Sequence, residues 1–351
     1  MITVVLEVQR RALRYAWYNG QATRPLAAGQ IDRVAVQTAE EATSAMLSAV
    51  GESIGQEQSV ELIAVRIPFG GKLFAGPTRV GPEVLAKLED LVPHAPMHLP
   101  ATVSVLRACL EAFPNVPVVA VFDTSFFADL PNNEALYAVD GELARSLDLR
   151  RFGYHGLLHQ AACASLSAAR VPESARVLSI CLEPRPELTA VVDGRPVMVT
   201  GGATPLEGLP GERLCGDIDP GIVLSLTQQS GLGLEQINAL LTQESGLRGL
   251  VGENVKLSEV LTGKSAESQL AAELFKYRLL LAAGAGVAAM GGVDAIVFSG
   301  RYHACAEALG SWLVAKLAAA CRAGRQQPTW YSFADPVEWV VASQARAAIA
   351  S

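Results

Sequence analysis

Apolar and polar residues alternate at the start of the chain in a pattern that predicts a β-hairpin. The stretch ITVVLEVQRRALRYAWYNG (residues 2–20) holds two alternating apolar runs on either side of the polar tip Gln9-Arg10-Arg11. The pair Asn19-Gly20, typical of a tight turn, closes the stretch. The chain therefore opens with a hairpin whose tip carries two arginines.

A second hairpin of the same design is predicted near the middle of the chain. Residues 177–182 and 188–192 form two apolar runs around the tip Glu183-Pro184-Arg185-Pro186, and Asp193-Gly194 follows as a turn. Each hairpin precedes a segment that mixes helices with further strands. This repeat suggests two related α/β domains that face one another, although two unrelated hairpins can also look alike.

The remaining periodicity predicts an α/β chain without a linker. Apolar runs predict strands at 62–67, 116–122 and 295–299, and helical spacing predicts helices at 36–50, 82–91, 100–112, 265–290, 304–322 and 337–350. Residues 204–220 are rich in turn formers, and two helices follow them. We expect an N-terminal domain over residues 1–148, joined by a C-terminal helix at 337–351, and a C-terminal domain over 149–336.

Composition and charge exclude several classes of protein. The chain has 351 residues, of which 50% are apolar, and its formal net charge is −7, which argues against a nucleic-acid partner. The start MITVVLEV lacks the basic region of a signal peptide, and the longest apolar stretch, near 279–290, is too short to span a membrane. Six scattered cysteines form no CxxC pair or Cys/His cluster, so we expect reduced thiols in the cytoplasm.

Polar residues whose side chains suit binding or catalysis follow several of the predicted strands. In α/β sheets functional groups gather where strands end. Each candidate residue also has an ordinary structural explanation, such as a surface ion pair, a helix cap or a buried histidine without a catalytic role. The candidates are Arg66, Asp123, His155, His159, Asp217 and Asp219.

Taken together, the motifs resemble one family. VAVFDTSFFADLP, RRFGYHGLLH, ATPLEGL, GDIDP and AAMGGVDAIVFS are similar to acetate kinase and to its propionate and butyrate kinase relatives, in order and in spacing. The resemblance implies two RNase H-like domains of the acetate-kinase, sugar-kinase and actin superfold, with a cleft between the domains. It also implies a homodimer that transfers the γ-phosphoryl group of ATP to a short carboxylate with the help of Mg²⁺.

The resemblance assigns roles to residues on the acyl side of the reaction. Arg66 matches the family's carboxylate-binding arginine, and a guanidinium fork suits a carboxylate or a phosphoryl group. Asp123 matches an aspartate that orients the metal or the substrate, and His155 matches a histidine that donates to the phosphoryl group in flight. His98 matches a second cleft histidine. An apolar pocket for the acyl tail would be walled by Phe69, Leu99 and Phe122.

The two hairpin tips depart from the family. The family carries Asn-x-Gly-Ser-Ser-Ser at the first tip, where this chain has Glu7 and Gln9-Arg10-Arg11-Ala12. It carries His-x-Gly-Asn-Gly at the second, where this chain has Cys181 and Glu183-Pro184-Arg185. Glycines let backbone amides approach a phosphate, whereas Pro184 has no amide hydrogen to donate. Glu7 and Glu183 would repel a triphosphate unless a metal bridges them.

Three further nucleotide-side positions have also changed. The family's Gly-Ile-Gly-Glu-Asn loop is replaced here by SGRYHACAE, in which Gly300 survives beside Arg301. Leu214 stands where the family has a catalytic arginine, and Arg213 lies one place earlier. Near the C-terminus Val337 takes the place of the metal-binding glutamate, with Glu338 next to it.

These departures lead to three hypotheses. The first is a degenerate homologue with weak or no kinase activity, which binds a small carboxylate, an acyl phosphate or another anion, or acts as a protein partner. The second is an active short-chain carboxylate kinase in which Arg213 replaces the lost arginine and Asp123 and Glu338 hold Mg²⁺ for ATP. The third is hydrolysis or acyl transfer from an acyl phosphate without a nucleotide, in which Asp123 and His155 act on water or an acceptor.

Several arginines bear on the first hypothesis. They would either converge on a new anion site beside Gly300 or pair with Glu7 and Glu183 and fill an abandoned pocket, and the second outcome is the one we favour. The arginines concerned are Arg10, Arg11, Arg185, Arg213 and Arg301.

Overall fold

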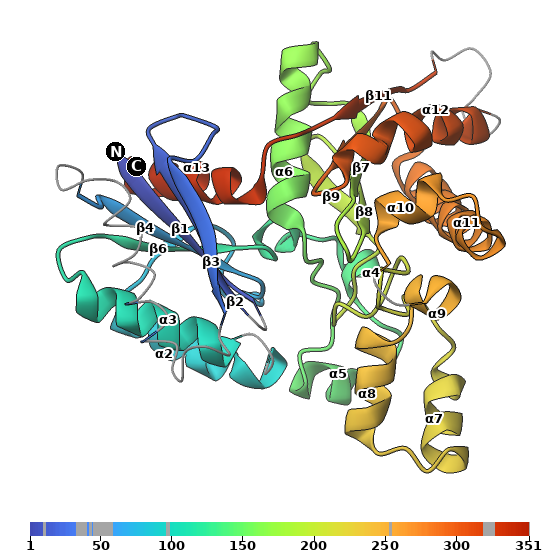
Figure 1. Cartoon of the computed structure of the whole chain (residues 1–351), viewed down its shortest axis with the longest axis horizontal. Helices are drawn as coiled ribbons and strands as arrows, with labels where there is room; N and C mark the ends of the chain where they lie inside the picture. Colours follow the sequence, from blue (N-terminus) through green and yellow to red (C-terminus); the bar gives the residue numbers. More distant parts are fainter. Residues whose placement is uncertain are drawn as a thin grey trace. The chain divides into compact units, whose positions relative to one another are not determined.

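The computed structural model describes two compact units of the chain (Figure 1). Unit 1 comprises Met1–Ala128 and Asp335–Ser351, and unit 2 comprises Asp129–Ala334. The predicted domain boundary at residue 148 therefore falls inside unit 2. The residues described are 1–9, 12–32, 41, 44, 59–95, 99–252, 255–318 and 327–350. Arg10, Arg11, His98 and most of the predicted helix at 36–50 lie outside them.

Unit 1 is built on a six-stranded mixed sheet in the order β3-β2-β1-β4-β6-β5. β1 pairs antiparallel with β2, and β2 with β3, whereas β1, β4 and β6 run parallel to one another. The central strands are apolar runs that bury both faces, as a parallel strand requires. The strands are β1 (Ile2–Val8), β2 (Ala12–Asn19), β3 (Ala27–Asp32), β4 (Leu62–Ile67), β5 (Thr78–Arg79) and β6 (Val118–Phe122).

Helices from both ends of the chain pack on this sheet. α3 (Leu99–Ala112) and α13 (Val337–Ala350) both contact β1, β4 and β6, and α2 (Pro82–Asp90) packs on α3. Each carries apolar residues at helical spacing, and α13 buries Val340, Val341 and Ala345. Two short 3₁₀ turns, η2 (Val92–His94) and η3 (Ser125–Phe127), connect the elements of unit 1. The C-terminal helix thereby completes the core of the N-terminal unit.

Unit 2 repeats the sheet topology of unit 1 in five strands. Its order is β11-β10-β7-β8-β9, with β7, β8 and β9 in an antiparallel meander and β7, β10 and β11 parallel. In unit 1 the meander β1-β2-β3 likewise adjoins the parallel strands β4 and β6. The predicted duplication is therefore confirmed. The strands are β7 (Arg176–Cys181), β8 (Glu187–Val192), β9 (Arg195–Val199), β10 (Ala295–Ser299) and β11 (Thr329–Ser332).

The helices of unit 2 differ in how deeply they are buried. α11 (Ala266–Met290), orange in Figure 1, packs on β7, β8 and β9 through Ala271, Phe275, Leu279 and Ala283. α6 (Gly156–Ser165) packs on β7 and β10, and α12 (Ala306–Leu317) packs on β11. The remaining helices are α4 (Asn132–Ala135), α5 (Gly141–Ser146), α7 (Pro220–Gln229), α8 (Leu234–Gln243), α9 (Arg248–Val251) and α10 (Leu257–Thr262), with 3₁₀ turns η4 (Leu166–Ala169) and η5 (His303–Cys305).

Most predicted elements match the described ones, and the omissions have a physical reason. β3 and β11 are short strands of mostly half-exposed or exposed residues, so their apolar periodicity is weak. β5 has only two residues and depends on its pairing with β6. Among the described residues, no helix combines the length and the hydropathy needed to span a membrane.

Candidate functional site

In unit 1 the predicted catalytic arginine lies between two carboxylates. β1 and β4 are neighbours, and their register places Glu7 beside Arg66, while Asp123 directly follows β6. Arg66 Nε donates to Asp123 Oδ1 and Oδ2 at 3.2 and 3.1 Å, and Nη2 lies 3.0 Å from Oδ2. Arg66 Nη1 donates to Glu7 Oε1 at 2.7 Å. All three guanidinium nitrogens thus face carboxylates of this chain.

The ion pairs continue from Glu7 to the C-terminal helix. Glu7 is also opposite Arg14 of β2, and Arg14 Nη1 lies 3.5 Å from Glu7 Oε2. Arg14 Nη2 lies 3.1 Å from Glu338 Oε1. Carboxylates and guanidiniums therefore alternate through a ladder that we call the charge ladder: Asp123, Arg66, Glu7, Arg14 and Glu338. Apart from Arg14, its side chains are at most 15% exposed.

The two predicted metal ligands do not fit that role as they stand. Mg²⁺ takes oxygen ligands and retains several waters. Asp123 instead binds Arg66, and Glu338 binds Arg14, so each carboxylate already faces a cation. Within the described ranges, His, Cys, Asp and Glu side chains form no group of three or more that could hold a metal ion.

The predicted apolar wall lies in the core of unit 1. Phe69, Leu99 and Phe122 are each at most 3% exposed, and Phe122 stacks on Phe74 with ring centroids 4.4 Å apart. Gly70 packs against the Phe122 ring, where a Cβ would come within 2.6 Å of it. The chain after β4 is thereby held close to Asp123, and Gly70 N donates to Thr124 Oγ1 at 2.9 Å.

In unit 2 His155 caps a helix and contacts the second hairpin. It is the N-cap residue of α6, is 7% exposed, and its Nε2 lies 2.9 Å from the carbonyl oxygen of Arg185. Its backbone amide donates to Glu187 Oε1 at 3.0 Å. The hairpin tip therefore contacts the imidazole of His155, and the following strand holds its backbone.

Glu187 is a buried carboxylate that sequence reasoning missed. It begins β8, is 4% exposed, and accepts hydrogen bonds from the amides of Tyr154 and His155 just before α6. His159 Nε2 lies 3.4 Å from its Oε1, and His159 Nδ1 lies 2.8 Å from Ser179 Oγ. Burial by itself raises the pKa of Glu187, but the hydrogen bond from His159 and the attraction of both histidines outweigh burial and lower it.

A small cavity adjoins these groups in unit 2. Its volume is about 20 Å³, roughly the room one water molecule needs. It is lined by His155, Arg185, Glu187 and Leu214, together with residues of the turn-rich segment. Arg213 is exposed and is not among the lining residues that the structure describes. Leu214, at the position of the family's arginine, thus supplies an apolar wall beside His155.

An ion pair within unit 2 joins the second hairpin tip to the residues that follow β10. Arg301 N donates to Glu183 Oε1 at 2.8 Å, and Arg301 Nε lies 3.7 Å from Glu183 Oε2. Gly300 has φ +86°, and a Cβ there would lie 2.9 Å from the Leu182 carbonyl oxygen, so the surviving glycine fits a close approach to the first strand. Arg301 therefore pairs with Glu183 as we favoured, whereas Glu7 pairs with Arg14 and Arg66, which the sequence did not single out for it.

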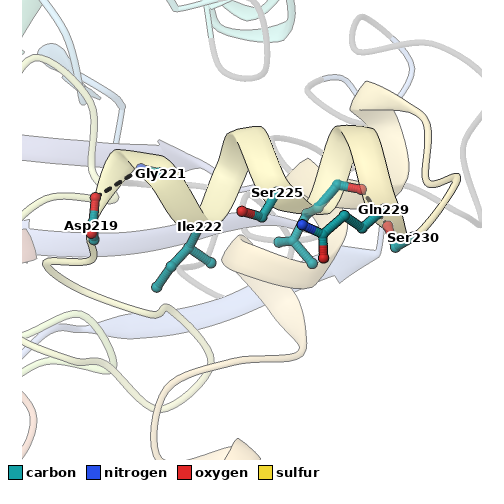
Figure 2. Close-up of a pocket in the computed structure, with 7 residues that line it drawn as sticks. Asp219, Gly221, Ile222, Ser225, Gln229 and Ser230 are labelled. Carbon is teal, nitrogen blue, oxygen red and sulfur yellow. Dashed lines mark hydrogen bonds between the residues drawn. The ribbon is translucent and has the colours of Figure 1, made fainter.

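The two aspartates of GDIDP have structural contacts. Asp217 Oδ1 accepts from Gly208 N at 2.8 Å, and Asp219 Oδ1 accepts from Gly221 N at 2.8 Å as the N-cap of α7. Figure 2 shows Asp219 at the start of α7, where Ile222, Ser225 and Gln229 line an open surface pocket of about 570 Å³. Of the predicted candidates only Asp219 lines this pocket among the described residues, and its carboxylate is engaged in capping α7.

A third polar cluster in unit 2 also escaped the sequence analysis. The Tyr137 hydroxyl donates to Glu207, Arg151 Nη2 lies 2.5 Å from Glu207 Oε1, and the Arg151 guanidinium lies over the Tyr137 ring. Tyr154 binds the carbonyl of Ala203 in the same segment at 2.6 Å. RRFGYHG was the one available signal, because it places Arg151 and Tyr154 beside His155.

Comparison with known proteins finds relatives that are named acetate kinases. The chain is 36% identical to an acetate kinase of Corynebacterium aurimucosum over 246 residues, and 39% identical to an acetate kinase of Syntrophobacter fumaroxidans over 241 residues. These matches cover 68% and 67% of this chain but only 61% and 58% of the relatives.

Solved structures share the fold over nearly the whole chain. A propionate kinase of Francisella tularensis superposes with a TM-score of 0.88 at 24% identity, covering 98% of both chains. An acetate kinase of Porphyromonas gingivalis gives 0.86 at 23% identity, covering 99% of both. The predicted α/β fold of the acetate-kinase and sugar-kinase superfold is confirmed. Residues 16–318 match the Acetokinase family. The motifs, the sheets and these matches agree, and the chain belongs to the Acetokinase family.

Proposed function

We propose that this chain is a degenerate member of its family, with weak or no ATP-dependent carboxylate kinase activity. The observation that carries the proposal is the 2.7 Å contact between Arg66 and Glu7. Glu7 stands where the family has a neutral asparagine, so it adds a negative charge beside the arginine expected to bind a carboxylate. An incoming carboxylate must compete with a tethered one for the same guanidinium, which weakens substrate binding.

The charge ladder affects a second requirement of phosphoryl transfer. That reaction depends on positioning and on cations that stabilise developing negative charge. Glu338 pairs with Arg14 and Asp123 pairs with Arg66, so both carboxylates proposed as metal ligands already face an arginine. Glu7 brings a further negative charge. The ladder sums to one negative charge, from three carboxylates and two guanidiniums, which disfavours a polyphosphate.

The second tip supports the same proposal from unit 2. Pro184 offers no amide donor, and the Glu183 carboxylate holds the Arg301 amide and side chain. Leu214 provides no charge beside His155. Arg66, Asp123 and His155 are nevertheless retained. We therefore propose residual binding of a small carboxylate or acyl phosphate, or a role as the partner of another protein in the cytoplasm.

An active short-chain carboxylate kinase is the second candidate. It is favoured by the 36–39% identity to relatives named acetate kinases and by retention of Arg66, Asp123 and His155. In that case ATP and Mg²⁺ would have to bind through groups other than those the family uses.

Calorimetric titration with ATP, with and without Mg²⁺, distinguishes the candidates. We expect no heat of binding at millimolar ATP for this chain, and the Syntrophobacter fumaroxidans acetate kinase titrated under the same conditions is the comparison. Binding that depends on Mg²⁺, followed by formation of acetyl phosphate that Arg66→Ala abolishes, would overturn the proposal.

A substitution at Glu7 directly tests the contact between Arg66 and Glu7 on which the proposal rests. Glu7→Asn removes the competing carboxylate while leaving Arg66 paired with Asp123. We expect acetate or acetyl phosphate to bind roughly tenfold more tightly to the variant, because a charged competitor for the Arg66 guanidinium has been removed. Glu61→Gln, at an exposed carboxylate of the same unit, is the matched control. Equal affinities in Glu7→Asn and the unchanged chain would show that Glu7 does not block the arginine.

A further inference from the structure

The carboxylate of Glu187 is surrounded by hydrogen-bond donors of unit 2. Its Oε1 accepts from the amides of Tyr154 and His155 at 3.1 and 3.0 Å, and its Oε2 accepts from Tyr154 N at 3.0 Å. His159 Nε2 lies 3.4 Å from Oε1. Both amides lie just before α6, where the helix dipole favours a negative charge. We call these two amides and the His159 imidazole the α6 donor cluster.

A buried serine sets the direction in which His159 donates. His159 Nδ1 lies 2.8 Å from Ser179 Oγ, and both residues are fully buried. An ionised carboxylate only accepts hydrogen bonds, so His159 must present Nε2–H to Glu187. The Ser179 hydroxyl then donates to Nδ1, which fixes this tautomer of the neutral imidazole. His159 is thereby held as a donor without needing a positive charge.

Bare backbone gives the carboxylate its space. A Cβ at Gly201 would lie 2.1 Å from Glu187 Oε2 and 3.1 Å from the Cα of Gly153. Glycine is the residue that lets backbone approach an anion this closely. The cavity of about 20 Å³ adjoins Glu187 as well, so shortening the Glu187 side chain would enlarge an existing space. Glu187 and His155 are 4 and 7% exposed, so this space lies close beneath the surface.

Two glutamates of unit 2 show that the cluster attracts negative charge. Glu134 is half-buried, its Oε1 accepts from Val199 N at 2.9 Å, and burial raises its pKa. Glu187 is more deeply buried, yet the histidines and the backbone hydrogen bond hold its pKa below the usual value. The donors around Glu187 therefore more than offset the cost of burying a carboxylate, whereas the single amide at Glu134 does not.

We propose that the α6 donor cluster is a binding site for a small carboxylate, which this chain keeps filled with its own Glu187. The side chain acts as an internal ligand, and it excludes free carboxylates from the space beside His155. Donors that contact both oxygens of one carboxylate select a planar anion over a spherical one. The inference concerns anion binding alone, so it holds whether or not the chain is an active kinase.

Replacing the internal ligand by a free one tests the proposal. Glu187→Ala removes the carboxylate and leaves the donors in place. Sodium formate at about 100 mM should then raise the thermal unfolding midpoint of the full-length variant by about 4–8 °C over sodium chloride at the same concentration, because formate supplies the missing carboxylate. The unchanged chain should shift by less than about 1 °C, since its site is already filled. Where the variant folds poorly, its refolding yield in formate and in chloride gives the same comparison.

Two further variants make the test specific. Glu134→Ala, the matched control, removes a carboxylate that accepts from one amide, and formate should not stabilise it. Adding His159→Leu to Glu187→Ala should weaken formate binding about tenfold, because one donor is lost. No gain from formate in Glu187→Ala, an equal gain from chloride, or a comparable gain in Glu134→Ala would overturn the proposal. Formate affinity that His159→Leu leaves unchanged would remove the imidazole from the site.

Discussion

Glu7 shows how one side chain changes the chemistry of its neighbours. Its carboxylate adjoins Arg66 on one side and Arg14 on the other, because β1 lies between β4 and β2. A neutral amide at the same place would leave Arg66 with a single carboxylate partner. Removing one member of a largely buried ion-pair network destabilises a fold, because the charge of its partner is left uncompensated.

Glu187 is a buried carboxylate of unit 2 with a different role. It is enclosed by two backbone amides and two histidines, and it lies at the N-terminus of α6, where a negative charge is favoured. A Cβ at position 201 would lie 2.1 Å from Glu187 Oε2, so Gly201 gives the carboxylate its space. This carboxylate fixes the backbone that carries His155.

Replacing Glu187 should remove a pH dependence of folding stability. The folded-state pKa of Glu187 is lowered, so its stabilisation is complete above the unfolded carboxyl pKa and disappears as the pH falls through the folded-state pKa. Glu187→Gln should cost about 3 kcal/mol near neutral pH, because a buried amide cannot accept all the hydrogen bonds. Urea unfolding between about pH 3 and pH 7 measures both effects.

The matched control is Glu235→Gln, at an exposed glutamate in the first turn of α8, which should leave the free energy of unfolding close to that of the unchanged chain. An unfolding free energy that varies with pH identically in Glu187→Gln and in the unchanged chain would refute the assigned role.

At the scale of elements, close packing decides what the helix sequence can tolerate. α11 holds two glycines, Gly284 and Gly286, which helix propensity alone treats alike. Gly286 faces β7 and β8, where an added Cβ would lie 2.7 Å from Leu178 Cδ2 and 3.3 Å from Ala190 Cβ. Gly284 has no atom within 4 Å of such a Cβ.

The two glycines should therefore respond in opposite directions to alanine. Gly284→Ala should raise the free energy of unfolding by about 0.5–1 kcal/mol, since the unfolded chain loses freedom. Gly286→Ala should lower it by about 1–2 kcal/mol, because the added methyl group overpacks the interface between helix and sheet. Denaturant titration of both variants is the measurement, and shifts of the same sign would contradict the packing argument.

At the scale of the whole molecule, each unit contains an antiparallel meander joined to parallel strands. The second unit is continuous in sequence, whereas the first needs the C-terminal segment Asp335–Ser351. α13 places Val340, Val341, Ala342 and Ala345 in the core beneath β1, β4 and β6. Unit 1 can therefore complete its core only after residues 335–351 have been made.

Deleting residues 335–351 should unfold unit 1 and spare unit 2. The deletion exposes apolar surface of three central strands. The burial free energy lost in this way exceeds the free energy of unfolding of a typical domain, which is about 5–15 kcal/mol. Limited proteolysis with mass spectrometry should show rapid cleavage within residues 1–128 and a protected fragment from unit 2. Ala347→Ser, on the exposed face of α13, is the control. Equal protection of both units would show that α13 is dispensable.

The sequence by itself determined the apolar central strands, the long helices and the repeat. Strands such as Leu62–Ile67 and helix 265–290 are recognisable because each buries a continuous or periodic apolar face, a property local to the segment. The motifs identified the family because each is a contiguous stretch of sequence and is likewise a local property.

Only the tertiary structure decided which charges meet. Arg66 and Glu7 are 59 residues apart, and only the pairing of β1 with β4 brings them together. Glu338 meets Arg14 because α13 returns to the first sheet, and Glu187 meets the amides of Tyr154 and His155 because the start of β8 lies against the residues just before α6. Ion pairs between distant segments leave no periodic signal in the sequence. The carboxylate partners of Arg66 and His155 therefore became evident only in the folded chain.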